Sequence, residues 1–326
     1  MIGVGIVGCG GMGSSLVSRL VDVDGAQLVR AYDADPQAAG KLTAKYGGEV
    51  SATYAELLDD PRVDAVIVAT PGFLHREYVV EAAEASKHVF CEKPMALTVE
   101  DCDEMIDACQ SAGVNLMVGQ VLRLLPVFVE SGHIVRERLG RPMAMGIMRI
   151  GGWGYDTGWR TRRDTCGGIL LEVNVHELDY MRHILGEPEE AFAYGGRYVL
   201  DHVDFPDTIF ASFRFENGAM GTLKAAVSSR MGRYTGEIIC ESGTLFYDNS
   251  SKTIAYREEG GEQVTLGGDE IPSVDGVATE ITEFVESISE NRTPNITGED
   301  GRMAVEMALA VERSVQEGRP IPIGEE

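Results

Sequence analysis

The chain has 326 residues, of which 44% are hydrophobic and 25% charged, which is enough apolar material for two cores. Its formal net charge of −24 opposes contact with nucleic-acid backbones and anionic membranes, so we expect neither as a partner. The apolar segment 2–7 begins the chain without the basic start of a secretory signal, and no apolar run reaches transmembrane length. We therefore expect a cytoplasmic location.

Cysteine spacing excludes the common zinc and redox motifs. The six cysteines form no C-x-x-C pair and no His/Cys cluster with zinc spacing. We expect buried, reduced thiols and no metal site.

Short apolar runs alternate with amphipathic stretches over the first 120 residues. The runs predict strands at 2–7, 27–32, 65–69, 88–91 and 114–118. The stretches between them predict helices at 14–23, 36–46, 75–85 and 99–111. Such alternation is typical of a parallel sheet covered by helices on both faces. We assign 1–120 to a Rossmann dinucleotide-binding domain.

The pattern changes beyond residue 120. A helix is predicted at 169–185, and the segments 208–215 and 220–228 flank Asn217-Gly218, which indicates a hairpin. A second hairpin is predicted to turn at 241–243, and a last helix at 299–316. We assign 121–326 to an α+β substrate-binding and oligomerisation domain with a mainly antiparallel open sheet.

The clearest motif follows the first predicted strand. It opens a helix, and its residues are Gly8-Cys9-Gly10-Gly11-Met12-Gly13. In this context Gly8 permits the tight turn, Gly10 lets the backbone approach a pyrophosphate, and Gly13 lets helix and strand pack closely. We expect Gly8, Gly10, Gly11, Met12 and Gly13 to bind the cofactor at the helix N-terminus.

Asp33 ends the second predicted strand, twenty residues after Gly13. A carboxylate there accepts hydrogen bonds from the adenosine ribose and repels a 2′-phosphate, and Asp35 adds to the repulsion. The sequence therefore predicts NAD as the cofactor, preferred over NADP.

Three further segments carry a resemblance to a known family. They are Ala69-Thr70-Pro71 with His75, Cys91-Glu92-Lys93-Pro94, and the run from Gly167-Gly168 to His176-Glu177-Leu178-Asp179. Together with the glycine motif, they resemble the glucose–fructose oxidoreductase / inositol dehydrogenase / MocA family over nearly the whole chain.

The resemblance implies a role for each matching position. Lys93 would contact the substrate hydroxyl, and His176 would be the general acid/base and also a substrate contact. Glu172 stands where family members usually have Asp, one methylene longer. The cofactor contacts implied at the remaining positions involve Thr70, Pro71, His75, Glu92, Lys93, Gln120, Trp159 and Arg160, with Arg123 near the same site.

The residue types agree with these roles. Oxidation of an alcohol needs a base for the hydroxyl proton, and histidine titrates in the suitable range. Glu172 and His176 are four residues apart on a predicted helix, so they share a face, and we expect Glu172 to act with His176 in catalysis by orienting the imidazole and stabilising its cationic form. Lys93 follows the strand 88–91, and open α/β sheets bind ligands at that end of their strands.

A basic group precedes the predicted catalytic helix. Arg160, Arg162 and Arg163 either hold an anionic substrate such as a sugar acid or form salt bridges with the many acids, and the second interpretation is favoured. Arg123 and Arg163 are kept as candidate substrate contacts.

These observations favour an NAD-dependent oxidoreductase acting on a secondary alcohol carbon of a sugar, inositol or related polyol. Two alternatives stay open: an enzyme that cleaves glycosides by oxidation and elimination with NAD recycled, and a non-catalytic NAD-binding sensor. The predicted strand 208–215 carries apolar residues on both of its faces, which suits burial on two sides. We therefore expect a homodimer or homotetramer.

Overall fold

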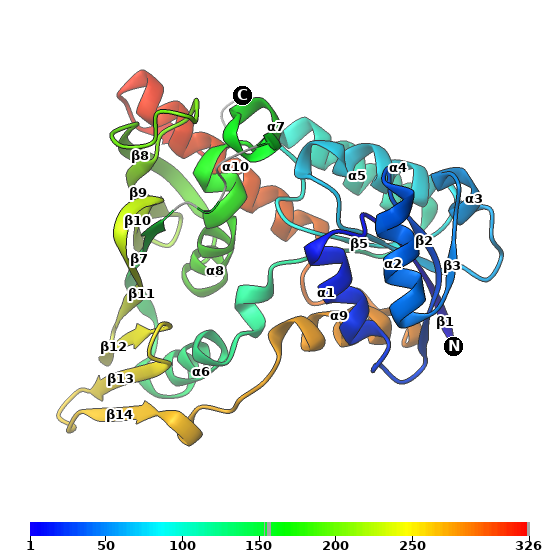
Figure 1. Cartoon of the computed structure of the whole chain (residues 1–326). Helices are drawn as coiled ribbons and strands as arrows, with labels where there is room; N and C mark the ends of the chain where they lie inside the picture. The colour runs from blue at the N-terminus through cyan, green and yellow to red at the C-terminus, as the bar shows by residue number, and fades with distance from the viewer. Residues whose placement is uncertain (153, 155–157, 325–326) are drawn as a thin grey trace. The chain divides into compact units, whose positions relative to one another are not determined.

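The computed structural model describes residues 1–152, 154 and 158–324 and divides into two compact units (Figure 1). The first unit contains Met1–Val121 and Asp275–Arg302, and the second contains Leu122–Val274 and Met303–Glu326. The sequence analysis placed everything after residue 120 in one domain. The structure differs in one segment, 275–302, which packs with the first unit.

The first unit is built on a six-stranded parallel sheet, as the alternating pattern predicts. Its strand order is β3-β2-β1-β4-β5-β6, and every neighbouring pair is parallel. The strands are β1 (Ile2–Val7), β2 (Ala26–Tyr32), β3 (Glu49–Val50), β4 (Ala65–Val68), β5 (His88–Cys91) and β6 (Leu116–Val118).

Six helices belong to the described part of this unit. They are α1 (Gly11–Leu20), α2 (Pro36–Tyr46), α3 (Tyr54–Leu58), α4 (His75–Glu84), α5 (Val99–Ala112) and α9 (Gly276–Ser289). The predicted helices are confirmed to within a few residues, whereas the short β3 and α3 were not predicted. Side chains cap several helices: Thr98 accepts a hydrogen bond from the Asp101 N–H at the start of α5.

Helix α9 explains why the segment 275–302 joins the first unit. It packs against α1, and its apolar side is buried. Phe284 contacts Phe90 of β5 edge-to-face, with ring centroids 5.8 Å apart, and Asn115 donates a hydrogen bond to Ser287. The helix therefore completes the hydrophobic cover of the parallel sheet.

The second unit contains a nine-stranded sheet in the order β14-β13-β12-β11-β7-β10-β9-β8-β15. All neighbours are antiparallel except β7 and β10, which confirms a mainly antiparallel sheet. The strands are β7 (Pro142–Gly152), β8 (Pro188–Gly196), β9 (Thr208–Phe215), β10 (Met220–Ala226), β11 (Ser228–Cys240), β12 (Gly243–Asp248), β13 (Thr253–Glu258), β14 (Val264–Gly267) and β15 (Ile321–Pro322).

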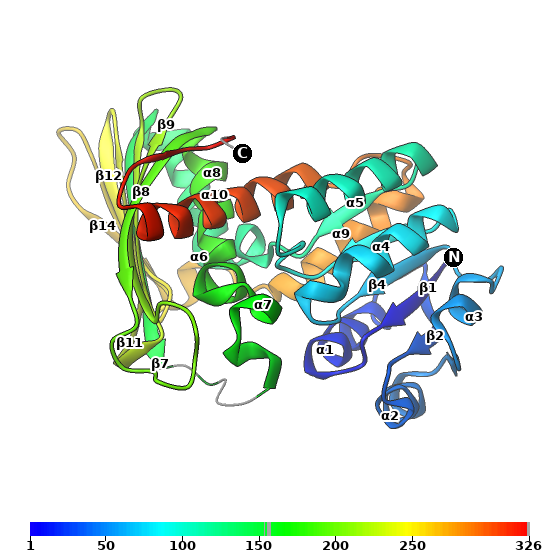
Figure 2. The ribbon, with the colours of Figure 1, turned by 90° about the horizontal axis from the view of Figure 1, so that it is seen from above.

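Helices cover one face of this sheet, as Figure 2 shows for α6 (Pro126–Ile134) and α8 (Val175–Leu185). Both predicted hairpins are present, and Gly218 has the positive φ of 84° that its turn requires. The last helix, α10 (Gly298–Glu317), ends before Gly318. The remaining helical segments are η1 (Gly72–Leu74), η2 (Val121–Leu124), η3 (Val135–Leu139), η4 (Gly158–Thr161), α7 (Arg163–Cys166), η5 (Leu170–Asn174) and η6 (Gly268–Glu270).

Among the described residues, no helix combines the length and the apolar character that crossing a membrane requires.

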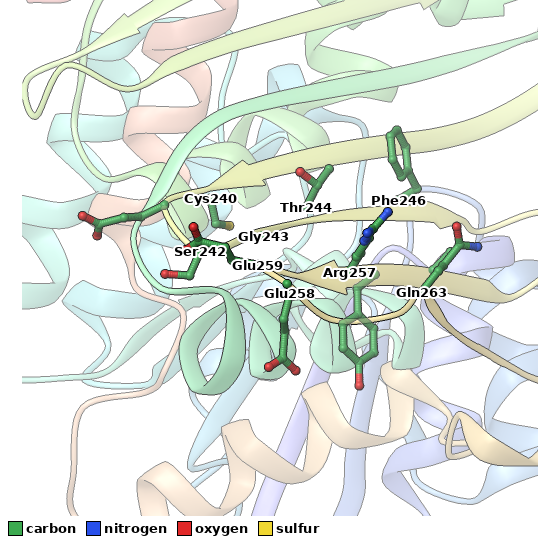
Figure 3. Close-up of a pocket in the computed structure, with 13 residues that line it drawn as sticks. Cys240, Ser242, Gly243, Thr244, Phe246, Arg257, Glu258, Glu259 and Gln263 are labelled. Atoms are coloured by element: carbon green, nitrogen blue, oxygen red, sulfur yellow. The ribbon is translucent and has the colours of Figure 1, made fainter.

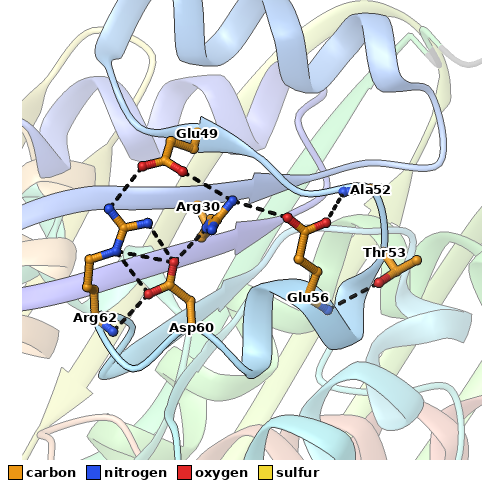
Figure 4. Close-up of polar contacts among 7 residues, drawn as sticks. All are labelled: Arg30, Glu49, Ala52, Thr53, Glu56, Asp60 and Arg62. Carbon is orange, nitrogen blue, oxygen red and sulfur yellow. Dashed lines mark hydrogen bonds and ion pairs between the residues drawn. The ribbon is translucent and has the colours of Figure 1, made fainter.

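A charged cluster ties β2, β3 and α3 to the turn before β4 (Figure 4). Asp60, whose side chain is 5% exposed, accepts hydrogen bonds from Arg30 Nε and Arg62 Nη2, both at 2.7 Å. Arg62 also binds Glu49 at 2.9 Å. The two guanidinium groups hold the pKa of the Asp60 carboxyl well below its usual range.

We expect Asp60→Asn to lower the free energy of unfolding by about 2 kcal/mol at neutral pH, because it removes charge-assisted bonds in a buried position. Because the pKa of Asp60 is lower in the folded state, its charge stabilises the fold at pH values above the pKa of the unfolded state. This stabilisation is lost as the pH falls. The difference from the wild type should therefore shrink below about pH 4. Urea titrations at pH 7 and pH 3.5 measure this. Glu49→Gln, at an exposed partner of the same cluster, should cost less than about 1 kcal/mol.

Candidate active site

The glycine loop lies between β1 and α1 and has the geometry of a dinucleotide cradle. Gly8 has φ +92°, and a Cβ there would lie 2.5 Å from the Ala69 carbonyl oxygen. A Cβ at Gly13 would lie 1.9 Å from the Gly8 carbonyl oxygen, so only glycine permits this close packing. At Gly10 and Gly11 a Cβ would meet open space, which leaves the backbone at the start of α1 accessible to a phosphate group.

Asp33 follows β2 and turns its carboxylate toward this loop. Its Oδ2 accepts a hydrogen bond from the Cys9 N–H at 2.7 Å, and its Oδ1 accepts one from the Asp35 N–H at 2.8 Å. Burial raises the pKa of the Cys9 thiol to about 12, so this cysteine stays neutral beside the carboxylate. The acid is therefore held next to the residues that approach a pyrophosphate.

Two neighbouring loops follow β4 and β5 at the same edge of the parallel sheet. Thr70 and Pro71 lie in the first loop, and the Thr70 Oγ1 is buried with no hydrogen-bond partner among the described residues. The His75 ring is fully buried, so it offers no exposed surface for the cofactor contact predicted from the sequence. Its ring nitrogens lie 2.8 Å from the Thr70 carbonyl oxygen and 2.9 Å from the Pro94 carbonyl oxygen.

Lys93 immediately follows β5 and Glu92. The Glu92 side chain is buried and folds back, so that its Oε2 accepts a hydrogen bond from the Lys93 N–H at 3.1 Å. Gln120 follows β6 and is fully buried. The glycine motif, Asp33, Thr70, Lys93 and Gln120 all follow strands of one parallel sheet, where ligands of such folds bind. The position of these residues at the carboxyl ends of the strands fits the binding of a dinucleotide.

The second unit carries Glu172 and His176. The predicted continuous helix 169–185 is instead a π-helical turn, η5, followed by α8. Glu172 lies in the π-helical turn and His176 in the first turn of α8, and such turns are frequent at functional sites. Glu172 is buried, and its Oε1 accepts a hydrogen bond from Arg160 Nε at 2.7 Å.

Arg160 also stacks on Trp159, with its guanidinium carbon 4.2 Å from the ring centroid. The aromatic ring and the Glu172 carboxylate thus hold the arginine from two sides. The structure therefore gives Arg160 a role in binding Glu172, while its predicted cofactor contact, like that of Trp159, stays a prediction.

The other candidate arginines also bind carboxylates. Arg123 forms a bidentate pair with the fully buried Asp179, at 2.7 and 2.6 Å. Arg163 binds Glu312 of α10 at 2.5 Å. Burial raises the pKa of Glu312 to about 7, and the arginine opposes that shift. These pairs agree with the salt-bridge interpretation of the basic group.

A buried cluster next to His176 was not predicted from the sequence. Glu177 is fully buried and accepts hydrogen bonds from Arg149 at 2.9 Å, from Asn174 at 2.8 Å and from the Tyr234 hydroxyl. Arg149 lies over the Tyr234 ring. The sequence signal is an acid adjacent to His176, but two of its partners, Arg149 and Tyr234, come from β7 and β11 and show no local pattern.

Comparisons with known proteins cover most of the chain. A family model described as "Oxidoreductase family, NAD-binding Rossmann fold" matches residues 2–120, and its companion, described as "Oxidoreductase family, C-terminal alpha/beta domain", matches residues 133–323. The chain is 29% identical to a myo-inositol 2-dehydrogenase of Thermotoga maritima, over 99% of this chain and 98% of that protein.

Two further proteins are similar to this chain. A 2,7-anhydro-N-acetylneuraminate hydratase of Escherichia coli is 32% identical over 69% of this chain and 61% of its own length. The crystal structure of aldose-aldose oxidoreductase from Caulobacter crescentus matches with a TM-score of 0.90 and 26% identity, over 98% of this chain and 99% of that one.

We expect Arg160 and Glu172 to be energetically coupled. Arg160→Leu and Glu172→Gln should each lower the free energy of unfolding, and the double variant should lose less than the sum by about 1 kcal/mol, because each single change leaves one charge unpaired. Urea unfolding of the four proteins measures the cycle. Additive losses would show that the two side chains act independently.

Proposed function

The chain belongs to the oxidoreductase family whose N-terminal part is an NAD-binding Rossmann fold, and on this premise we propose that it moves a hydride between a nicotinamide dinucleotide and a secondary alcohol carbon of a sugar, inositol or related polyol. The observation that carries the proposal lies in the first unit. Lys93 and the glycine loop follow β5 and β1, on either side of β4, at the same edge of one sheet.

We assign the proton chemistry to side chains of this chain. Bound NAD would accept the hydride that leaves the alcohol carbon. His176 takes the hydroxyl proton as the carbonyl forms, since a neutral imidazole is a base of suitable strength. Lys93 holds the reacting oxygen and stabilises negative charge as it develops there. Glu172, bound to Arg160, supports the helical turn that precedes His176.

We also propose that Asp33 gives NAD preference over NADP. Its carboxylate is bound to the Cys9 and Asp35 backbone, and Asp35 carries a second negative charge nearby. A 2′-phosphate at the ribose would meet both charges, whereas ribose hydroxyls would donate hydrogen bonds to Asp33.

A second candidate function uses the same groups without net oxidation. The relative named as a hydratase favours it. In that reaction a hydride would pass from the glycoside to bound NAD, the neighbouring C–H would lose its proton as the leaving group departs, and the hydride would return to the carbonyl carbon of the eliminated product. NAD is then recycled, so product forms without release of NADH.

NADH formation from a panel of inositols, aldoses, sugar acids and glycosides tests the main proposal, with NAD and NADP compared at equal concentration. We expect turnover on at least one panel member, and Lys93→Ala should lower kcat by about 100-fold or more. Lys87→Ala is the matched control, because Lys87 precedes β5 at the opposite edge of the same sheet and binds the Val63 carbonyl.

Glycoside cleavage without NADH release would replace the first proposal with the second. NAD binding with neither reaction would favour a sensor. Faster turnover with NADP would contradict the role of Asp33.

We propose a homo-oligomer formed through the uncovered face of the nine-stranded sheet. By strand register that face carries the large exposed apolar side chains of Tyr194, Phe210, Met220, Ile239 and Phe246, of which Tyr194 and Phe210 are directly paired. A pocket of about 920 Å³ lies over β12 and β13, lined by Phe246, Thr244 and Arg257 among others (Figure 3). Exposed apolar patches of this kind mark interaction surfaces.

Light scattering at micromolar concentration should therefore give a mass of two or four chains. Phe210→Asp with Phe246→Asp should shift it toward one chain, because the charges would be buried in the interface. Val21→Asp, at an exposed site of the first unit, is the control and should leave the mass unchanged. A monomeric wild type would refute the proposal.

We propose a cytoplasmic location as well. All six cysteines are buried free thiols, a state that a reducing compartment preserves.

A further inference from the structure

His75 joins two loops that the proposed function needs. It is the first residue of α4, and its ring is fully buried. Nδ1 lies 2.9 Å from the Pro94 carbonyl oxygen, and Nε2 lies 2.8 Å from the Thr70 carbonyl oxygen. One carbonyl belongs to the loop after β4 and the other to the loop after β5, and these two strands are direct neighbours. The buried ring therefore bridges the two loops.

The two ring nitrogens face two backbone carbonyls, and a neutral ring can donate a hydrogen bond to one of them. A buried carbonyl without a hydrogen-bond donor costs about 1–3 kcal/mol. Burial lowers the pKa of the His75 ring, so at neutral pH the ring carries one N–H. A proton on Nδ1 donates to the Pro94 carbonyl, and Pro94 directly follows Lys93.

Lys93 is then held on both sides along the chain. Before it, Glu92 Oε2 accepts the Lys93 N–H at 3.1 Å, and the Cys91 thiol lies 3.3 Å from the Glu92 carbonyl oxygen. After it, the Pro94 carbonyl oxygen lies 2.9 Å from His75 Nδ1. The backbone of Lys93 therefore has little freedom, and its long side chain starts from a defined point.

We propose that His75 is a positioning residue, which fixes the loop of Lys93 by donating its Nδ1–H to the Pro94 carbonyl. The inference rests on the proposed function, because it gives Lys93 a task that depends on position. A displacement of about 1 Å at a reacting group can cost about 100-fold in rate. His75 touches neither substrate nor cofactor in this role, and its effect passes through Lys93.

Three variants test the proposal. His75→Leu fills similar space without a donor, and we expect kcat to fall at least about 10-fold. The dissociation constant of NADH should change less than about 3-fold, because the glycine loop and Asp33 are untouched. His75→Asn keeps an N–H donor near the position of Nδ1 and should recover most of kcat.

Val79→Ala is the control for lost stability. Val79 lies on the same helix and is fully buried, but it has no polar group. It should lower the melting temperature as His75→Leu does and leave kcat unchanged. Wild-type kcat in His75→Leu, a His75→Asn variant as slow as His75→Leu, or an equal loss of kcat in Val79→Ala would overturn the proposal.

A readout without turnover separates this inference from the proposed function. The chain has only six lysines, so 13C-dimethylation yields few lysine signals by NMR. We expect the Lys93 signal to shift in His75→Leu, to return in His75→Asn and to stay in place in Val79→Ala. If the wild type turns over no panel member but these shifts appear, the proposed function fails and the positioning stands. An unmoved Lys93 signal in His75→Leu overturns the positioning whatever the activity.

Discussion

The parallel pairing of β1 with β2 and β4, and of β4 with β5, is the constraint on which the candidate cofactor site depends. Parallel strands end at one edge, so the residue after each strand meets the residue after its neighbour. Helix α1 begins close to the end of β1, and the glycine at position 13 permits that approach, because a Cβ would strike the Gly8 carbonyl. This arrangement of strands determines the positions of Asp33, Thr70 and Lys93.

The second unit relies on a different interaction, the pairing of buried carboxylates with arginine. Each carboxylate is nearly inaccessible to water, and removal of its partner would leave a buried charge. The planar guanidinium can bind both carboxylate oxygens in a fixed geometry, as Arg123 does with Asp179, which an ammonium group cannot. The pairs are Arg123 with Asp179, Arg149 with Glu177, Arg160 with Glu172 and Arg163 with Glu312.

Local patterns predicted the elements that local forces define. The helix 36–46 was predicted to the residue, since Asp35 caps it and Pro36 begins it. The edge strand β3, two residues long, and the five-residue α3 have too few residues to show a period. The π-helical turn containing Glu172 was likewise read as ordinary helix, because the apolar spacing of the two forms is similar over one turn.

By itself the sequence determined the class of fold, the family and the position of each motif along the chain, because glycine spacing, strand-helix alternation and turn residues act within a few residues of each other. Tertiary structure alone decided that His75 is buried between two loops, that Arg123 and Arg160 bind carboxylates, and that α9 covers the parallel sheet. Apart from His75 and Thr70, which are 5 positions apart, the residues joined in this way lie from 12 to more than 250 positions apart, as Arg160 with Glu172 and Arg19 with Asp275 show. No local pattern encodes such a partner, because it depends on how the whole chain packs.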